Sequence, residues 1–506
     1  MPPIESGAEA LEPFLSDAAH VPGGFAAGIA FPRTTNEAAA LIADARRVLA
    51  IGAQSSLTGG ATPRGDLIIG TRALTGIELL SDRRVRVGAG VPLAELQRVL
   101  AGQGLFYPPV PTYDGAFVGG TLATNAAGPA TFKYGSARQW VDALTVVLAN
   151  GSVIEVKRGD VTASPAGWFD LESGSGEIVR VPVPAYVMPA VAKLSAGYFA
   201  RPEMDLVDLF VGSEGTLGFL AAATLRVIPL PTRCVALVTF ASDTQAVRMT
   251  AVLRQSADAR GHGMPGLDVS AVEFMDSRAL TLVPDEIFDR ANVTRPLAGN
   301  GFLLVQLEVS GDADEVLERF EDVLSVCGFD TDPQVALPGD DRGAARLFAL
   351  REGVPSSLNA RIAATKARLR QDVEKTAGDV IVPFERLEDS LALFRSTFER
   401  HGLDYAIWGH VSDGNMHPNV VPSSIDEVRR GRIALLEIAR GVIAMGGAPL
   451  AEHGVGRSAL KQQMLRDLYG ERGIEQMRAV KRALDPEWKF AAGVLFPQQD
   501  GVRTAD

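Results

Sequence analysis

The segment GHVSDGNMHPNVV, residues 409–421, holds two of the six histidines in this 506-residue chain, His410 and His417. The Asp413-Gly414 pair between them predicts a two-residue type I′ hairpin turn, because both central positions of that turn need a positive φ. With this turn, His410 lies directly opposite His417. Opposed side chains of an antiparallel pair have Cβ atoms roughly 4.5–5.5 Å apart, so the spacing predicts two imidazoles that could share one metal ion.

The same hairpin determines which other side chains accompany the histidines. Ser412 pairs with Asn415 beside the turn, and Trp408 and Asn419, two residues further along their strands, fall on the histidine face. Histidines that face water, or one that is hydrogen-bonded inside a core, would produce the same pattern. The hairpin taken alone therefore leaves a metal site and a structural role open.

Three stretches combine closely spaced glycines with hydroxyl side chains: GAQSSLTGG at 52–60, GGTLATNAAG at 119–128 and GSEGTLG at 212–218. Glycine lets the backbone approach a ligand closely, and successive N–H groups form concave anion sites. Such loops could hold a pyrophosphate, although any one of them alone is also typical of an ordinary turn. The first two match neither GxGxxG nor GxxxxGK[ST], which argues against Rossmann and P-loop folds.

Regular elements must position these loops and the hairpin. In the first half, residues 34–49 predict a helix capped by Thr34 or Thr35, and residues 141–157 predict two strands joined by a tight turn. A proline-rich stretch, RVIPLPTR at 226–233, then marks a boundary.

Beyond the boundary, strands alternate with amphipathic helices. Residues 234–240 and 301–309 predict strands, and residues 243–256 and 312–328 predict helices. This alternation predicts an α+β domain in which helices pack on one side of a sheet.

Size and charge narrow the function classes. A chain of 506 residues is longer than one core usually serves, which predicts two or three domains. The net charge of −12, with no basic run, argues against nucleic acid or anionic lipid as a partner. Two cysteines without a motif, Cys234 and Cys327, predict a reducing compartment, the cytoplasm. We see no signal or transit peptide and no apolar run of the ~20 residues needed to span a bilayer.

Four motifs together resemble one family. YPPVPTYDGAFVGGTLATNAAGPATFKYG (107–135) and VGSEGTLGFLAAATLRVIP (211–229) look like the FAD-binding domain of vanillyl-alcohol oxidase-type flavoproteins. GHVSDGNMHPN (409–419) and AEHGVGRSALKQQML (451–465) resemble the C-terminal half of FAD-linked dehydrogenases of D-2-hydroxy acids, which include D-lactate, glycolate and D-2-hydroxyglutarate dehydrogenases. The resemblance runs from about residue 30 to 497 in the family's order.

The resemblance implies a set of cofactor contacts. It assigns the pyrophosphate to Gly52, Gln54, Ser55, Ser56 and Leu57, and the flavin to Pro109, Gly119, Gly120, Thr124, Gly128, Glu214, Gly215 and Gly218, with Tyr134 and Gly135 close by. Some relatives attach FAD through a histidine of the first glycine loop. Since GAQSSLTGG has none, we expect non-covalent FAD.

The resemblance also implies a metal site and a base. His410, His417 and Glu452 match the ligands of a divalent metal beside the flavin, for which zinc is favoured and iron or manganese would also fit. The next residue, His453, matches the catalytic base. Asn419 matches a position near the substrate, and Arg351 of LREGVP would grip the substrate carboxylate.

The implied reaction is oxidation of a D-2-hydroxy acid to the 2-oxo acid. His453 takes the hydroxyl proton while a hydride passes to flavin N5. The alternatives are a flavoprotein oxidase that uses O₂, an electron-transfer flavoprotein subunit, and a colourless metal hydrolase. The electron acceptor is unnamed and a homodimer is left open.

Departures from the family leave the acid undetermined. Ala377 occupies the place of a lysine, and Pro355 that of a threonine, in the 2-hydroxyglutarate enzymes, and AAGV (491–494) replaces their Asn-Pro-Gly-Lys. The segment 359–376, which precedes Ala377, is longer and more basic than the matching segment of the 2-hydroxyglutarate enzymes. Its cations could reach a second anionic group or be solvated helix charges: Lys366, Arg368, Arg370 and Lys375.

The expected fold class is α+β in three parts. Residues 1–230 form an FAD-binding domain of the vanillyl-alcohol oxidase type, and residues 231–440 form an α+β substrate cap with an antiparallel sheet covered by helices. Residues 441–506 return to the FAD domain and bring Glu452 and His453 between the two.

Overall fold

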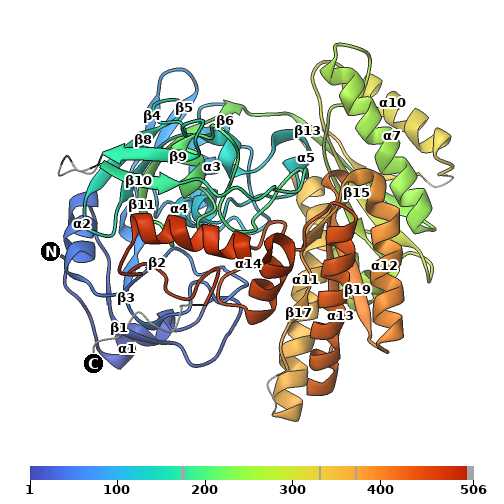
Figure 1. Cartoon of the computed structure of the whole chain (residues 1–506). Coiled ribbons are helices and arrows are strands. Elements are labelled where there is room, and N and C mark those ends of the chain that lie inside the picture. The colour runs from blue at the N-terminus through green and yellow to red at the C-terminus, as the bar shows by residue number, and fades with distance from the viewer. Residues whose placement is uncertain (173–175, 177, 330–331, 371–372, 498–506) are drawn as a thin grey trace.

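The computed structural model describes residues 1–172, 176, 178–329, 332–370 and 373–497. Its first half contains a parallel sheet of order β1-β3-β2, an antiparallel sheet of order β4-β5-β11-β7-β8, and the pairs β10-β9 and β12-β6 (Figure 1). The strand bounds are β1 Phe25–Ala30, β2 Val48–Ile51, β3 Arg64–Gly70, β4 Ile77–Leu80, β5 Arg84–Gly88, β6 Leu105–Phe106, β7 Val141–Val147, β8 Val153–Lys157, β9 Trp168–Glu172, β10 Ile178–Pro182, β11 Phe219–Arg226 and β12 Ile228–Pro229. The helices are α1 Ala8–Leu11, η1 Glu12–Phe14, α2 Thr35–Asp44, η2 Thr71–Ala73, α3 Leu93–Ala101, α4 Val118–Ala123, α5 Thr131–Tyr134, η3 Ala137–Trp140 and α6 Leu206–Phe210.

The second half is built on an eight-stranded antiparallel sheet of order β16-β13-β15-β14-β19-β20-β17, in which β18 also pairs with β20. Its strands are β13 Arg233–Phe240, β14 Val269–Met275, β15 Gly301–Glu308, β16 Gln334–Ala336, β17 Thr376–Ala377, β18 Val380–Ile381, β19 Tyr405–His410 and β20 Asn415–Val420. Its helices are α7 Asp243–Gly261, α8 Ser277–Leu282, α9 Asp285–Ala291, α10 Ala313–Val326, α11 Asp341–Leu369, η4 Phe384–Arg386, α12 Leu387–Arg400, η5 Val411–Asp413, α13 Ile425–Ala444 and α14 Ala459–Leu484.

The predicted helix over 34–49 is wrong at its C-terminal end. The side chain of Thr34 accepts a hydrogen bond from the backbone N–H of Glu37, as expected of a cap, but α2 ends at Asp44. Val48 instead begins β2, which pairs with β3 on one side, and it bridges to Phe490. Strand pairing on both sides of Val48 stabilises an extended backbone there, and it outweighs the helical pattern of the residues around 45–49. The predicted strands over 141–157 are confirmed as β7 and β8.

Helices cover both faces of the large sheet, so the prediction of helices on one side is wrong. Apolar residues of α7, α10, α12 and α13 share a core with one face, and α8, α9 and α11 pack on the other. The reason lies in the central strands: every residue of β14, β15, β19 and β20 is buried. A strand buried on both faces needs a cover on each.

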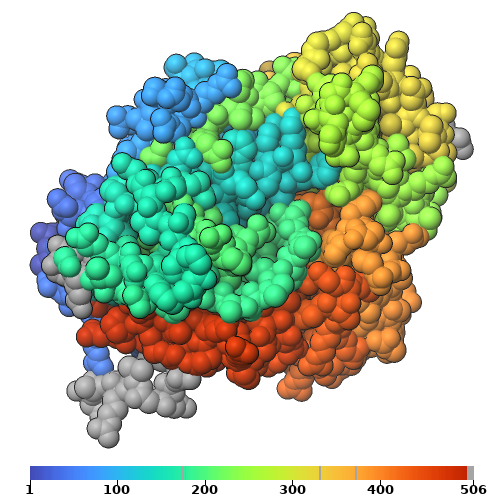
Figure 2. Space-filling model, turned by 45° about the horizontal axis from the view of Figure 1, so that its top comes forward, coloured from blue at the N-terminus to red at the C-terminus, as the bar shows by residue number. Residues whose placement is uncertain are grey.

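The C-terminal segment packs along the first half of the chain. α14, red in Figures 1 and 2, lies across the blue and green elements of that half. Beyond it, Phe490 bridges to Val48 of β2, and the Nζ atom of Lys489 donates to the Ile42 carbonyl oxygen at 2.8 Å. The division of the chain at residues 230 and 440 stays a prediction. None of the described helices is both long and apolar enough to cross a membrane.

Candidate functional site

The histidine hairpin forms with a different turn from the predicted one. β19 and β20 pair so that His410 lies opposite Asn415, and His417 lies opposite Trp408. The connection is the 3₁₀ turn η5 followed by Gly414 at φ 84°. The predicted two-residue turn, with His410 directly opposite His417, is therefore wrong.

Contacts of the turn explain the longer loop. The carboxylate of Asp413 accepts the backbone N–H of Asn415 at 3.0 Å, and the Ser412 hydroxyl accepts the N–H of Val272 in β14 at 3.1 Å. These bonds hold the turn to itself and to the neighbouring strand. Sequence patterns within the hairpin carry no information about that strand.

The change of register leaves His410 and His417 on the same face of the hairpin. The pairing slips by two residues, and side chains alternate with a period of two, so the same residues stay on one face. The ring centroids of His410 and His417 lie 5.5 Å apart. Asn419 shares this face; its Nδ2 donates to the His417 carbonyl oxygen at 2.8 Å, and its Oδ1 is buried without a hydrogen bond among the described residues.

Glu452 lies at the centre of three imidazoles. Its Oε1 atom is 3.4 Å from Nε2 of His410, 3.3 Å from Nε2 of His417 and 3.7 Å from Nε2 of His453. Imidazole nitrogens and a carboxylate oxygen are donor types that suit Zn²⁺, Fe²⁺ or Mn²⁺. The buried Nδ1 of His417 has no hydrogen-bond partner within the described part of the chain. The residues present therefore fit a divalent metal.

Asp379 holds the loop that carries Glu452. Its Oδ2 atom accepts the backbone N–H groups of Glu452 at 3.0 Å and His453 at 2.8 Å, and its Oδ1 accepts from Nδ2 of Asn415 at 3.2 Å. The carboxylate also lies 3.5 Å from Nδ1 of His453 and 3.7 Å from Nδ1 of His417. Among the described residues, Asp379, His417, Glu452 and His453 form the group of atoms close enough to hold a metal ion, and the predicted ligand His410 is not part of that group.

The pKa values of His453 and His410 are shifted in opposite directions. Burial lowers the pKa of His453 to about 4 against the opposing charge of Asp379, which leaves the ring neutral near pH 7. Burial would also lower the pKa of His410, but the charge of Glu273 outweighs it and raises the pKa to about 9. His453 is thus open to a proton near pH 7, although its lowered pKa makes it a weaker base than a free imidazole, whereas His410 is held by its carboxylate partner.

Lys193 supplies a buried cation behind Glu452. Its Nζ atom lies 2.8 Å from Oε2 of Glu452 and 3.2 Å from Oδ2 of Asp413, and its side chain is 1% exposed. Burial would raise the pKa of Glu452, but Lys193 and His410 outweigh it and hold the pKa well below the usual value. One oxygen of Glu452 is thereby engaged, and the other is left facing the histidines.

Arg351 is a buried residue of α11. Its Nε atom donates to Oε2 of Glu273 at 2.6 Å, and its Nη groups make no hydrogen bond among the described residues. The basic residues that follow it are divided. Lys366 and Arg368 lie on the exposed side of α11, whereas Lys375 is partly buried, and burial beside Lys461 lowers its pKa to about 8.

Two of the glycine loops meet the segment after Glu452. Both carboxylate oxygens of Glu214 accept backbone N–H groups, from Val455 at 2.8 Å and from Gly456 at 2.7 Å. Burial raises the pKa of Glu214, and these two bonds oppose the rise. A Cβ atom on Gly456 would lie 2.2 Å from Oγ1 of Thr58. The 52–60 and 212–218 loops thus lie beside the metal candidates.

The loops fit an FAD cofactor. The backbone N–H groups of Ser55, Ser56 and Leu57 donate to no acceptor in the described part of the chain, as a pyrophosphate cradle requires. A Cβ on Gly120 or Gly215 would meet no atom within 4 Å, which indicates open space beside both loops. The other predicted cofactor residues lie in or beside the glycine loops: Gly52, Pro109, Gly119, Thr124, Gly128, Gly135 and Gly218.

Two predicted cofactor residues use their side chains elsewhere. Nε2 of Gln54 donates to the carbonyl oxygens of Phe14 at 3.0 Å and Ala61 at 2.9 Å. The hydroxyl of Tyr134 donates to the carboxylate of Glu308 in β15 at 2.6 Å. Gln54 therefore braces its own loop, and Tyr134 ties the first half of the chain to the large sheet.

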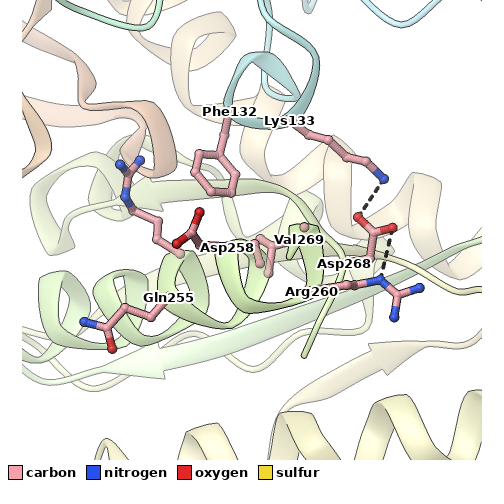
Figure 3. A pocket seen from close by; sticks show the side chains of 10 residues that line it. Phe132, Lys133, Gln255, Asp258, Arg260, Asp268 and Val269 are labelled. Carbon is pink, nitrogen blue, oxygen red and sulfur yellow. Dashed lines mark ion pairs between the residues drawn. The ribbon is translucent and has the colours of Figure 1, made fainter. Parts of the chain in front are cut away.

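A pocket of about 710 Å³ lies outside this site (Figure 3). Phe132 and Lys133 of α5 face α7 and the start of β14 across it, and Lys133 pairs with Asp268 at 2.6 Å. No predicted site residue lines it. Its lining residue Arg254 donates to the Ser412 carbonyl oxygen, so the pocket lies behind the histidine turn.

Sequence reasoning missed Glu273, Asp379 and Lys193. A signal for Glu273 was available: a single carboxylate inside the apolar strand AVEFM needs a buried partner. Lys193 lies in VAKLSAGY, where neither periodicity nor spacing marks it.

Comparison with known proteins places this site in a family. The family model described as FAD linked oxidases, C-terminal domain, matches residues 229–495, and the model described as FAD binding domain matches residues 26–157. The solved structure of an alkyldihydroxyacetonephosphate synthase shares the fold with a TM-score of 0.61 at 14% identity, over 94% of this chain and 77% of that one.

Curated relatives match over nearly the whole length. Glycolate oxidase subunit GlcD of Bacillus subtilis is 28% identical over 92% of this chain and 88% of its own. A probable mitochondrial D-lactate dehydrogenase of Danio rerio is 28% identical over 90% and 82%, and a D-2-hydroxyglutarate dehydrogenase of Xanthomonas citri is 28% identical over 93% and 89%. The predicted family is confirmed: the chain belongs to the FAD-linked oxidases and is a flavin-dependent oxidoreductase.

Proposed function

We propose that this enzyme oxidises a D-2-hydroxy acid to the 2-oxo acid with non-covalent FAD and a divalent metal. The observation that carries the proposal is the position of Glu452 Oε1 among three imidazole nitrogens at 3.3–3.7 Å, beside the glycine loops. Relatives named for glycolate, D-lactate and D-2-hydroxyglutarate support the substrate class.

His410, His417 and Glu452 would hold the metal, for which we favour zinc; iron or manganese fit the same donors. When bound, the metal supplies Lewis acidity at the substrate hydroxyl, and FAD supplies the two-electron acceptor for the hydride at N5. Non-covalent attachment is supported by the absence of histidine from GAQSSLTGG.

The chain's own residues orient the substrate and move its proton. Arg351 has Nη donors without partners among the described residues, which can grip the substrate carboxylate through two parallel hydrogen bonds. His453 is neutral near pH 7 and accepts the hydroxyl proton on Nε2, with Asp379 3.5 Å from its Nδ1. Asn419 offers its unpaired Oδ1 on the same face.

The proposal extends to the kind of electron acceptor and to the cellular compartment. We favour a dehydrogenase over an oxidase that uses O₂, because relatives are named as D-lactate and D-2-hydroxyglutarate dehydrogenases. The metal candidates, base and arginine favour an enzyme over a subunit that only relays electrons. We also propose the cytoplasm, since Cys234 and Cys327 are both buried and unpaired.

The test is a visible spectrum of the purified protein under anaerobic conditions. D-lactate, glycolate, D-2-hydroxyglutarate and bulkier D-2-hydroxy acids are added one at a time, with the L-enantiomers of the chiral acids as controls. We expect flavin absorbance near about 450 nm that bleaches with one D-acid, in protein whose metal content is about one zinc per chain.

Each outcome decides a different part of the proposal. Bleaching that reverses on admission of air would replace the dehydrogenase by an oxidase. A yellow protein that no hydroxy acid bleaches would overturn the substrate class. A fully active protein without metal would overturn the metal site.

A further inference from the structure

Glu273 is a buried carboxylate in the centre of the large sheet. It lies in β14, all of whose residues are buried, and its side chain is 1% exposed. Burying an ionised carboxylate costs several kcal/mol unless charged or hydrogen-bonded partners offset it. The partners of Glu273 therefore indicate why a carboxylate occupies this strand.

The two partners of Glu273 come from different elements of the site. Oε1 contacts Nδ1 of His410 at 2.5 Å across the β14–β19 pair, in which Glu273 and His410 are direct partners. Oε2 accepts from Nε of Arg351 in α11 at 2.6 Å. Glu273 thus connects Arg351 to His410, and His410 in turn faces Glu452.

We propose that Glu273 is a positioning residue that orients His410 for the metal and Arg351 for the substrate carboxylate. This inference rests on the proposed function. A carboxylate can only accept, so Nδ1 of His410 must carry a proton. Nε2 is then the nitrogen that faces Glu452 and would bind the metal, once the metal displaces the proton that Nε2 carries. The bond at Nε of Arg351 holds the guanidinium so that its Nη groups are left for the substrate.

Replacing Glu273 with glutamine reverses this arrangement. Nε–H of Arg351 can only donate, so the amide oxygen of Gln must face Arg351 and its NH₂ group must face His410. Nδ1 of His410 must then accept, which moves the ring proton to Nε2 and occupies the lone pair that would bind the metal. The substitution changes no volume, so we expect the fold to persist.

The experiment compares zinc and oxalate binding by the FAD-loaded wild type, Glu273→Gln and the control Asp276→Asn at about pH 7.5. Asp276 follows the same strand, is also buried and pairs with Arg395, and it bonds to no histidine within the described residues. Zinc is titrated in competition with a chromophoric chelator. Oxalate, a dicarboxylate with no C–H bond that could give up a hydride, is followed by the change in flavin absorbance. We expect Glu273→Gln to weaken zinc binding by about 10- to 100-fold and to weaken oxalate binding, with Asp276→Asn unchanged.

Three results would count against these ideas in distinguishable ways. Equal zinc affinity in Glu273→Gln and wild type would overturn the inference alone. Equal losses in Glu273→Gln and Asp276→Asn would assign the effect to removal of any buried carboxylate and also overturn it. A wild type that binds no zinc would overturn the metal site of the proposed function itself.

A second measurement does not depend on the variant folding. The ¹⁵N spectrum of histidine-labelled, zinc-loaded wild type reports the protonation of each ring nitrogen, and the chain has only six histidines. We expect one ring with a protonated Nδ1 in a strong hydrogen bond and a metal-bound Nε2, assigned to His410 by its loss in His410→Gln. A deprotonated Nδ1 at His410 would overturn the inference.

Discussion

Each of the three imidazoles around Glu452 has a carboxylate near its other ring nitrogen. Glu273 is 2.5 Å from Nδ1 of His410, whereas Asp379 is 3.7 Å from Nδ1 of His417 and 3.5 Å from Nδ1 of His453. The side chain of His453 is also the most exposed of the three rings, at 28%. The ring with the short bond is suited to a fixed ligand, and the more accessible ring is suited to proton transfer.

Asp276 gives a pH-dependent prediction away from the metal candidates. Burial raises its pKa to about 6, against the opposing charge of Arg395 and two backbone N–H groups. The pKa of Asp276 in the folded protein lies above the unfolded value of 3.8, so the folded state binds the carboxyl proton more tightly. This proton stabilises the fold fully below pH 3.8, and the stabilisation is lost as pH rises through 6. Between about pH 5 and pH 7.5 the wild type should lose about 1.4 kcal/mol relative to Asp276→Asn.

The measurement is the difference in apparent melting temperature between wild type and Asp276→Asn at both pH values and one scan rate. The wild type should gain stability relative to the variant at the lower pH. A difference that is independent of pH would show that the carboxyl is ionised in the fold throughout this range.

At the scale of elements, the hairpin β19–β20 depends on one glycine. Gly414 has φ 84°, and a Cβ atom there would lie 2.3 Å from the Val382 carbonyl oxygen. Its own carbonyl oxygen accepts the Val382 N–H at 3.2 Å. A side chain at this position would meet backbone atoms that cannot move independently of β18.

We therefore expect Gly414→Ala to lower both the melting temperature and the zinc content of the purified protein. Gly402→Ala is the matched control, because Gly402 also has a positive φ, 61°, but its Cβ would meet only Arg430 Nη1 at 3.4 Å. The control should show only the backbone strain of about 1–2 kcal/mol and keep its zinc. Equal zinc loss in both variants would contradict a specific role for the turn.

At the scale of the whole molecule, the first half depends on the C-terminal segment. Arg457 donates from Nη1 to the Thr62 carbonyl oxygen at 2.6 Å, and Phe490 bridges to Val48. The buried Lys481 donates from Nζ to the Thr216 carbonyl oxygen at 2.6 Å. These contacts join residues hundreds of positions apart in the chain, and the red C-terminal segment lies along the blue-green first half in Figure 2.

A chain that ends at residue 440 should fail to bind FAD and should be degraded rapidly by protease, because β2 and the glycine loops lose their C-terminal partners. A chain that ends at Pro497 keeps every contact described above and serves as the control. FAD content by absorbance and limited proteolysis measure both effects. A soluble, yellow 1–440 chain would contradict this dependence.

Local sequence determined much of this protein. The order of its motifs identified the family, and the period of two along a strand placed His410 and His417 on one face, although their register was wrong. The glycine loops were also singled out from the sequence, and Arg351 through the family resemblance, but the burial of Arg351 came only from the structure. The roles of these residues at the site stay predictions.

Only the tertiary structure decided what surrounds them. Lys193 and Glu452 are 259 residues apart, Glu273 and His410 are 137 apart, and Arg351 and Glu273 are 78 apart. No periodicity or turn pattern spans such distances, because those patterns arise from neighbours along the chain. The charges that orient the ligands come together only when the large sheet, its helices and the returning C-terminal segment pack around a common point.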